Sequence, residues 1–110
     1  MYMRIGVSMK KAIQIDAKDN VATVTTGVER GEPVQIISES GSVISEVRAS
    51  SRIPSFHKLA IAEIPKGIRV LKYGETIGIS TSQIQVGDWV HIHNVESAAV
   101  PTSAFRREEA

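Results

Sequence analysis

With 110 residues, of which 42% are hydrophobic and 23% charged, the chain is long enough for one small domain with its own core and too short for a second domain of ordinary size. Thirteen basic and 12 acidic residues give a formal net charge of +1, and the basic residues are scattered, so the charge pattern predicts no nucleic-acid binding. The absence of cysteine excludes disulfides, thiolate metal sites and cysteine nucleophiles, and fits an intracellular protein.

The two ends of the chain carry no recognisable chemistry. The first residues, MYMRIGVSMKKAI, lack an apolar run of signal-peptide length, and no stretch is long enough to span a bilayer, so we expect a cytoplasmic protein that is not membrane bound. Residues 1–18 are expected to form an N-terminal arm or an added edge strand, and residues 98–110 a charged C-terminal tail. In that tail, Phe105 is a lone aromatic side chain that could dock on a partner.

Short extended runs rich in isoleucine, valine and threonine recur between glycines and prolines, which is typical of an all-β fold. A helix competes with a strand only around residues 43–50, and we favour a strand there. The fold class that we expect is therefore a compact all-β single domain. Its predicted strands are Ala12–Asp16, Val21–Thr26, Pro33–Ser38, Ser42–Arg48, Lys58–Ile64, Arg69–Lys72, Thr76–Ser80 and Trp89–Asn94.

One short pattern occurs three times: an apolar residue, two others, a glycine, two others and a valine. Its glycines are Gly31, Gly67 and Gly87, and each is expected to end a turn that precedes a strand. The repeats are too short and too unevenly spaced for a solenoid. They are therefore interpreted as turns of one non-repetitive β fold.

The last predicted strand carries the clearest functional candidates. Because side chains alternate along an extended strand, Val90 and Ile92 are expected to face the core, and Trp89, His91 and His93 the opposite side. Two imidazoles about 7 Å apart on one face can bind a divalent cation together with a further ligand. They could instead transfer a proton or form an ordinary solvated polar face.

Four short sequence runs occur along the chain in an order that is specific to one protein family. They read DNVA at residues 19–22, HKLAIAEIPKG at 57–67, VLKYGETIG at 70–78 and HIHN at 91–94. Together they resemble the SAF domain of the altronate and galactarate dehydratase family, over residues 19–97, and this resemblance implies a β-clip fold. The family usually has glycine where this chain has Phe56, so the turn before His57 is expected to differ locally.

In this family the domain is either the N-terminal part of a long sugar-acid dehydratase or a separate small subunit, as in sulfolactate sulfo-lyase. The resemblance implies a non-autonomous small subunit of a carbon–oxygen or carbon–sulfur lyase. Its partner would be a large catalytic subunit, its substrate an acidic sugar or hydroxy acid, and its cofactor a divalent metal, Fe²⁺ or Mn²⁺. The implied residues are His57, His91 and His93 for catalysis, His91 and His93 for the metal, and Lys58, Lys72, Tyr73 and Asn94 for the substrate.

Two other classes of function remain open. SAF-like domains also occur in sialic acid synthases and in a flagellar assembly chaperone, so the chain could be a non-catalytic module that binds a ligand or a protein. It could also be a structural or regulatory subunit that uses an exposed edge strand. Structural roles compete as well: Tyr73 could simply pack in a turn, and Asn94 could close the last strand by bonding to the backbone. A homo-oligomer is compatible with all three classes.

Overall fold

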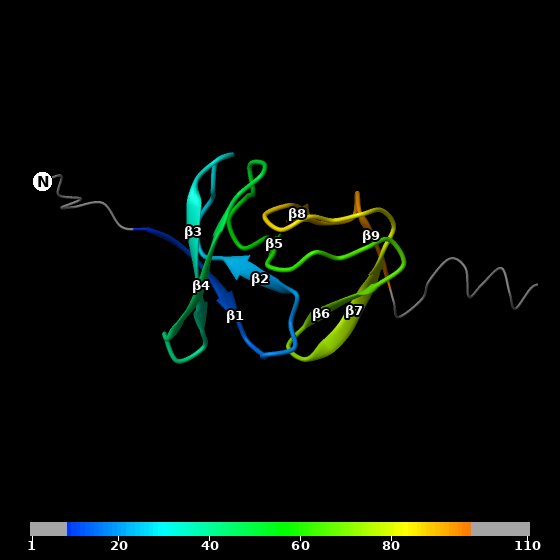
Figure 1. Ribbon diagram of the computed structural model, residues 1–110, viewed down its shortest axis with the longest axis horizontal. Coiled ribbons are helices and arrows are strands. Elements are labelled where there is room, and N and C mark those ends of the chain that lie inside the picture. The colour runs from blue at the N-terminus through cyan, green and yellow to red at the C-terminus, as the bar shows by residue number, and fades with distance from the viewer. Residues whose placement is uncertain (1–8, 98–110) are drawn as a thin grey trace, which may run out of the picture.

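The computed structural model describes residues 9–97, which contain strands and turns but no helix (Figure 1), so the predicted all-β fold is confirmed. No helix that could cross a membrane occurs in this part of the chain. The strands are β1 (Lys10–Gln14), β2 (Val21–Val24), β3 (Pro33–Ser38), β4 (Val43–Arg48), β5 (Lys58–Ala60), β6 (Arg69–Lys72), β7 (Glu75–Ser80), β8 (Trp89–Val90) and β9 (Val95–Ser97).

The strands form two sheets. One has six strands in the order β4-β3-β1-β2-β5-β8, and the other has three in the order β6-β7-β9. Neighbours pair antiparallel except β1 and β3, which are parallel. Figure 1 shows the smaller sheet at one side of the larger one, next to β2. Two sheets without a helix among the described residues are consistent with the β-clip fold that the resemblance implies.

The arm or edge strand expected for residues 1–18 is corrected in part. Residues 10–14 form β1, which lies inside the six-stranded sheet with β2 on one side and β3 on the other. Its main-chain groups are therefore paired on both edges, unlike those of an arm or an edge strand. Residues 1–8 and the predicted tail at 98–110, with Phe105, lie outside the described residues.

Two predicted strands, Pro33–Ser38 and Arg69–Lys72, coincide with β3 and β6. The predicted strand Lys58–Ile64 ends early, at Ala60, and the last predicted strand is wrong beyond Val90. Residues 91–94 form a turn, after which the chain enters β9, a strand that the sequence pattern did not reveal. The turn forms because a polar side chain bonds to the backbone there, as described below for the candidate site.

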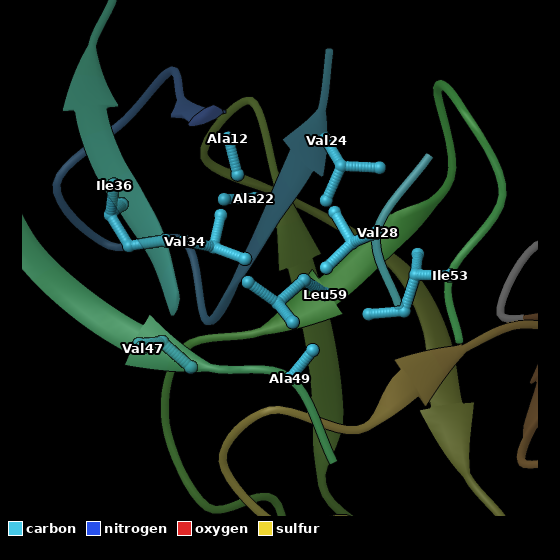
Figure 2. Close-up of a cluster of buried hydrophobic side chains, with 10 residues drawn as sticks. All are labelled: Ala12, Ala22, Val24, Val28, Val34, Ile36, Val47, Ala49, Ile53 and Leu59. Atoms are coloured by element: carbon cyan, nitrogen blue, oxygen red, sulfur yellow. The ribbon is translucent and has the colours of Figure 1, made fainter. Parts of the chain in front are cut away.

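Buried aliphatic side chains form two clusters on opposite faces of β2 and β5. In β5, Leu59 belongs to the first cluster and its neighbour Ala60 to the second, as expected for alternating side chains of a strand that is buried on both faces. Burial of one Val, Ile or Leu side chain contributes roughly 1.5–3 kcal/mol. The strand that follows His57 is therefore firmly anchored. The first cluster (Figure 2) consists of Ala12, Ala22, Val24, Val28, Val34, Ile36, Val47, Ala49, Ile53 and Leu59.

Two adjacent polar residues tie the larger sheet to the smaller one. The carboxylate of Asp19 accepts hydrogen bonds from the N–H groups of Tyr73 and Gly74, at 3.0 and 2.7 Å. The amide of Asn20 accepts one from the N–H of Leu71 (2.8 Å) and donates one to the carbonyl of Arg69 (2.9 Å). The DNVA run (residues 19–22) and the KYGE turn (residues 72–75) thus form one structural connection, which holds Tyr73 at a φ of +58°.

Candidate functional site

The pairing of β5 with β8 brings two distant histidines together. The two strands are antiparallel, with Lys58 opposite Val90. His57 directly precedes β5 and His91 directly follows β8, so the two residues lie across from each other at the same end of this strand pair. Their ring centroids are 4.8 Å apart.

Trp89 lies at the centre of the site. Its indole stacks on the imidazole of His91, with centroids 5.5 Å apart and planes 7° from parallel, and it contacts the ring of His93 at 5.2 Å. The indole N–H donates a hydrogen bond of 3.1 Å to Nδ1 of His57. All three predicted catalytic histidines therefore surround one tryptophan. We call His57, Trp89, His91 and His93 the imidazole cluster.

The turn at residues 91–94 gathers these rings, and Asn94 holds it closed. The side chain of Asn94, only 7% exposed, accepts a hydrogen bond from the N–H of His91 and donates one to the carbonyl of Trp89, both at 2.9 Å. The main-chain N–H of Asn94 also donates to the carbonyl of His91 at 3.0 Å. The predicted explanation, that one continuous strand places Trp89, His91 and His93 on the same face, is therefore wrong, because a turn brings the rings together. Val90 is buried as predicted, but Ile92 is 82% exposed instead of facing the core.

Two hollows open beside the imidazole cluster, and His91 and Ile92 line both. The larger one, of about 740 Å³, is a broad, solvent-open depression. The smaller one measures about 250 Å³ and is largely apolar, with Lys58, His91 and Ser97 as its polar residues. Neither encloses a small molecule without a further wall. The larger is lined by Ser50, Ser51, Ser82, Gln83, Asp88, Trp89, His91, Ile92, His93 and Asn94, and the smaller by Lys58, Ile77, His91, Ile92, Val95 and Ser97.

Positive charge gathers on this side of the domain. Burial lowers the pKa of Lys58, and the charge of Lys72 lowers it further. Loss of hydration lowers the pKa of His91 below its usual 6.5, with added repulsion from His57, Lys58 and His93. The surroundings of His91 therefore disfavour its protonation and suit an anionic ligand, such as a carboxylate, that would relieve this repulsion.

The other predicted substrate residues are less closely placed. The ammonium of Lys72 lies 4.9 Å from the ring centre of Tyr73, a cation–π contact in the KYGE turn. Tyr73 is 59% exposed and lines a separate groove of about 210 Å³ with Phe56, so it is not brought to the imidazole cluster. Asn94 lies in the site, and its two side-chain bonds account for its position structurally.

The predicted metal site needs at least three protein ligands close together. Among residues 9–97 no three histidine, cysteine, aspartate or glutamate side chains are grouped so that they could hold a metal ion. In addition, Nδ1 of His57 is engaged by the indole of Trp89. These residues do not form a metal site on their own, and binding through His91 and His93 stays a prediction that requires ligands from elsewhere.

Sequence reasoning gave Trp89 no part of its own in the site. The alternating pattern did place Trp89 on the same side as His91 and His93, which was the available signal. What the pattern could not show is its hydrogen bond to His57, 32 positions earlier in the chain.

The sequence profile of the altronate/galactarate dehydratase SAF domain matches residues 10–98. The chain belongs to this family. The match begins with β1, nine residues before the boundary expected at residue 19, and includes the whole imidazole cluster.

Two relatives of this SAF domain are much longer proteins. This chain is 33% identical to the altronate dehydratase of Escherichia coli over 94 residues, which are 86% of this chain and 18% of that enzyme. The altronate dehydratase of Bacillus subtilis is 28% identical over 89 residues, or 81% of this chain and 17% of that enzyme. The chain thus spans less than a fifth of the length of these dehydratases.

A third relative is a short protein, and the alignment covers most of both chains. The subunit alpha of (2R)-sulfolactate sulfo-lyase from Chromohalobacter salexigens is 35% identical over 85 residues, which are 74% of this chain and 88% of that subunit. The SAF domain is therefore homologous both to a part of long dehydratases and to nearly all of a small lyase subunit.

Proposed function

We propose that this chain is the small subunit of a lyase of the sugar-acid dehydratase type and works with a large catalytic subunit on a second polypeptide. The observation that carries the proposal is the gathering of all three histidines around Trp89, next to Lys58 and beside two open hollows. Homology to a sulfo-lyase subunit over 88% of its length supports the two-chain arrangement.

The proposed substrate is an acidic sugar or another hydroxy acid. Elimination next to a carboxylate needs a group that removes the α-proton and groups that stabilise the negative charge that develops on oxygen. His91 suits the first task, because its lowered pKa keeps the imidazole neutral and able to accept a proton near neutral pH. Lys58 supplies a cation beside it for the carboxylate.

The large subunit is needed for three reasons. The hollows beside the imidazole cluster are open, so water is excluded only when another surface covers them. The leaving group needs a proton donor, and Asp88, the one acidic residue among the described residues that line the larger hollow, is already bonded to the hydroxyl of Ser50 and the N–H of Gln85. Fe²⁺ or Mn²⁺, implied by the family, would also need ligands from the partner.

The test is co-expression with the large subunit, followed by elimination assays on aldonates, aldarates and sulfonated hydroxy acids, with Fe²⁺, Mn²⁺ or a chelator. Replacing both His91 and His93 by alanine should leave the complex assembled and reduce turnover by about 100-fold or more. The control is Glu46→Ala, an exposed change in β4 at the opposite edge of the sheet, which should not alter turnover. An assembled double variant with full turnover would instead indicate a non-catalytic binding module or a structural subunit.

A further inference from the structure

The bond between Trp89 and His57 fixes where the proton of a neutral imidazole lies. An indole N–H can only donate, so the nitrogen that it meets must offer a lone pair. That nitrogen is Nδ1 of His57, at 3.1 Å from the indole nitrogen. A neutral His57 in this arrangement carries its proton on Nε2.

Both partners of this bond are held in place by their surroundings. Trp89 pairs within β8 against β5, stacks on His91, and has its carbonyl bound by Asn94. His57 donates its main-chain N–H to the carbonyl of residue 54 at 3.1 Å and accepts at its own carbonyl from the N–H of residue 24 at 2.9 Å. The main chain is thus fixed by hydrogen bonds at both residues. This fixed backbone holds the indole of Trp89 opposite Nδ1 of His57.

We propose that Trp89 is a positioning residue that sets the tautomer of His57, so that His57 presents its Nε2–H as a hydrogen-bond donor to an anionic oxygen of the substrate. An imidazole in this state cannot accept a proton at Nε2 or bind a metal through that nitrogen. His57 and His91 therefore have different tasks: His57 donates a hydrogen bond to the substrate, and His91 accepts a proton from it. This division of catalytic tasks rests on the proposed function, whereas the tautomer of His57 does not.

The tautomer can be read from the chain alone by ¹H–¹⁵N correlation spectroscopy of its imidazoles. The measurement is made at about pH 8.5, above the ordinary titration range of histidine. We expect His57 to show a protonated Nε2 and an unprotonated Nδ1 in the native chain. The variant Trp89→Phe keeps the aromatic ring but has no N–H, and should return His57 to a mixture of tautomers. A proton on Nδ1 in the native chain, or an unchanged tautomer in Trp89→Phe, would overturn the proposal.

A second variant covers the case in which Trp89→Phe does not fold. The chain has a single tryptophan, so its indole N–H gives one unambiguous signal. In His57→Phe this proton loses its acceptor and should exchange with solvent faster, while Glu46→Ala should leave its exchange rate unchanged. An equal exchange rate in native chain and His57→Phe would show that the bond does not exist. No large subunit is needed for either measurement, so failure here is distinct from failure of the proposed lyase function.

Discussion

Gly87 and Gly67 occupy the same place in the recurring turn, yet an added methyl group should affect stability very differently at the two sites. Both have φ in the left-handed region, at +95° and +85°. A Cβ at residue 67 would meet nothing within 4 Å. At residue 87 it would lie 2.3 Å from the carbonyl oxygen of Arg48 and 3.3 Å from the nitrogen of Ser50. The pair Gly87→Ala and Gly67→Ala therefore separates backbone strain from steric conflict.

The magnitudes follow from these surroundings. A non-glycine residue in the left-handed region costs about 1–2 kcal/mol, and both variants lose this much. Only Gly87→Ala adds overpacking against main-chain atoms, at about 1–3 kcal/mol or more. Relief of that clash also displaces the hydrogen bond from the N–H of Ser50 to the carbonyl of Gly87, worth about 0.5–1.5 kcal/mol. We expect Gly87→Ala to lose about 3–6 kcal/mol of a total of about 5–15 kcal/mol.

The assay is equilibrium unfolding in urea, followed by the fluorescence of Trp89. Gly87 donates its N–H to the carbonyl of Ala60 just before β8, so the reporter lies two residues from the change. Gly67→Ala should shift the midpoint modestly with an unchanged slope, whereas Gly87→Ala should be barely folded or unfolded in water. Losses equal to within about 0.5 kcal/mol in the two variants would refute the reasoning.

Three further outcomes are expected. Phe56→Gly should raise the free energy of unfolding by about 1 kcal/mol, because Phe56 has a φ of +67° and is 75% exposed; a loss of stability in urea would contradict this. Asn94→Ala should cost about 1–3 kcal/mol, whereas Gln83→Ala, an exposed change lining the same hollow, should cost nothing measurable. In an NMR titration His91 should show a pKa below 6.5, which Lys58→Met raises and Lys72→Met leaves unchanged. Since the unfolded chain binds this proton more readily, His91 should lower stability as the pH falls through about 6.5; a folded-state pKa equal to that value would remove the effect, and a higher pKa would reverse its sign.

The strands that could be predicted are short apolar runs bounded by clear turn signals. β3 lies between Gly31 and Gly41 and β6 between Gly67 and Gly74, and the predicted bounds of both strands were correct. The end of β8 was missed because an asparagine side chain competes with the sheet for the backbone of residues 89–91, and such competition depends on geometry rather than on periodicity.

The site could be predicted in its membership but not in its arrangement. The resemblance pointed to His57, His91 and His93, and the pairing of β5 with β8 explains why they meet. The position of Tyr73, in contrast, depends on Asp19, 54 residues away, which holds the KYGE turn from the other sheet. Contacts of this separation leave no periodic trace in one sequence, so Tyr73 could be assigned to the site only by family resemblance.

The chain has three histidines, and all of them lie in the imidazole cluster. A reagent that acylates imidazoles therefore modifies histidine at this one location of the chain, and the labelled histidines can be told from labelled lysines by peptide mass. Loss of labelling when a candidate protein is added would reveal which protein covers the location. A screen of that kind needs neither a known substrate nor a working assay.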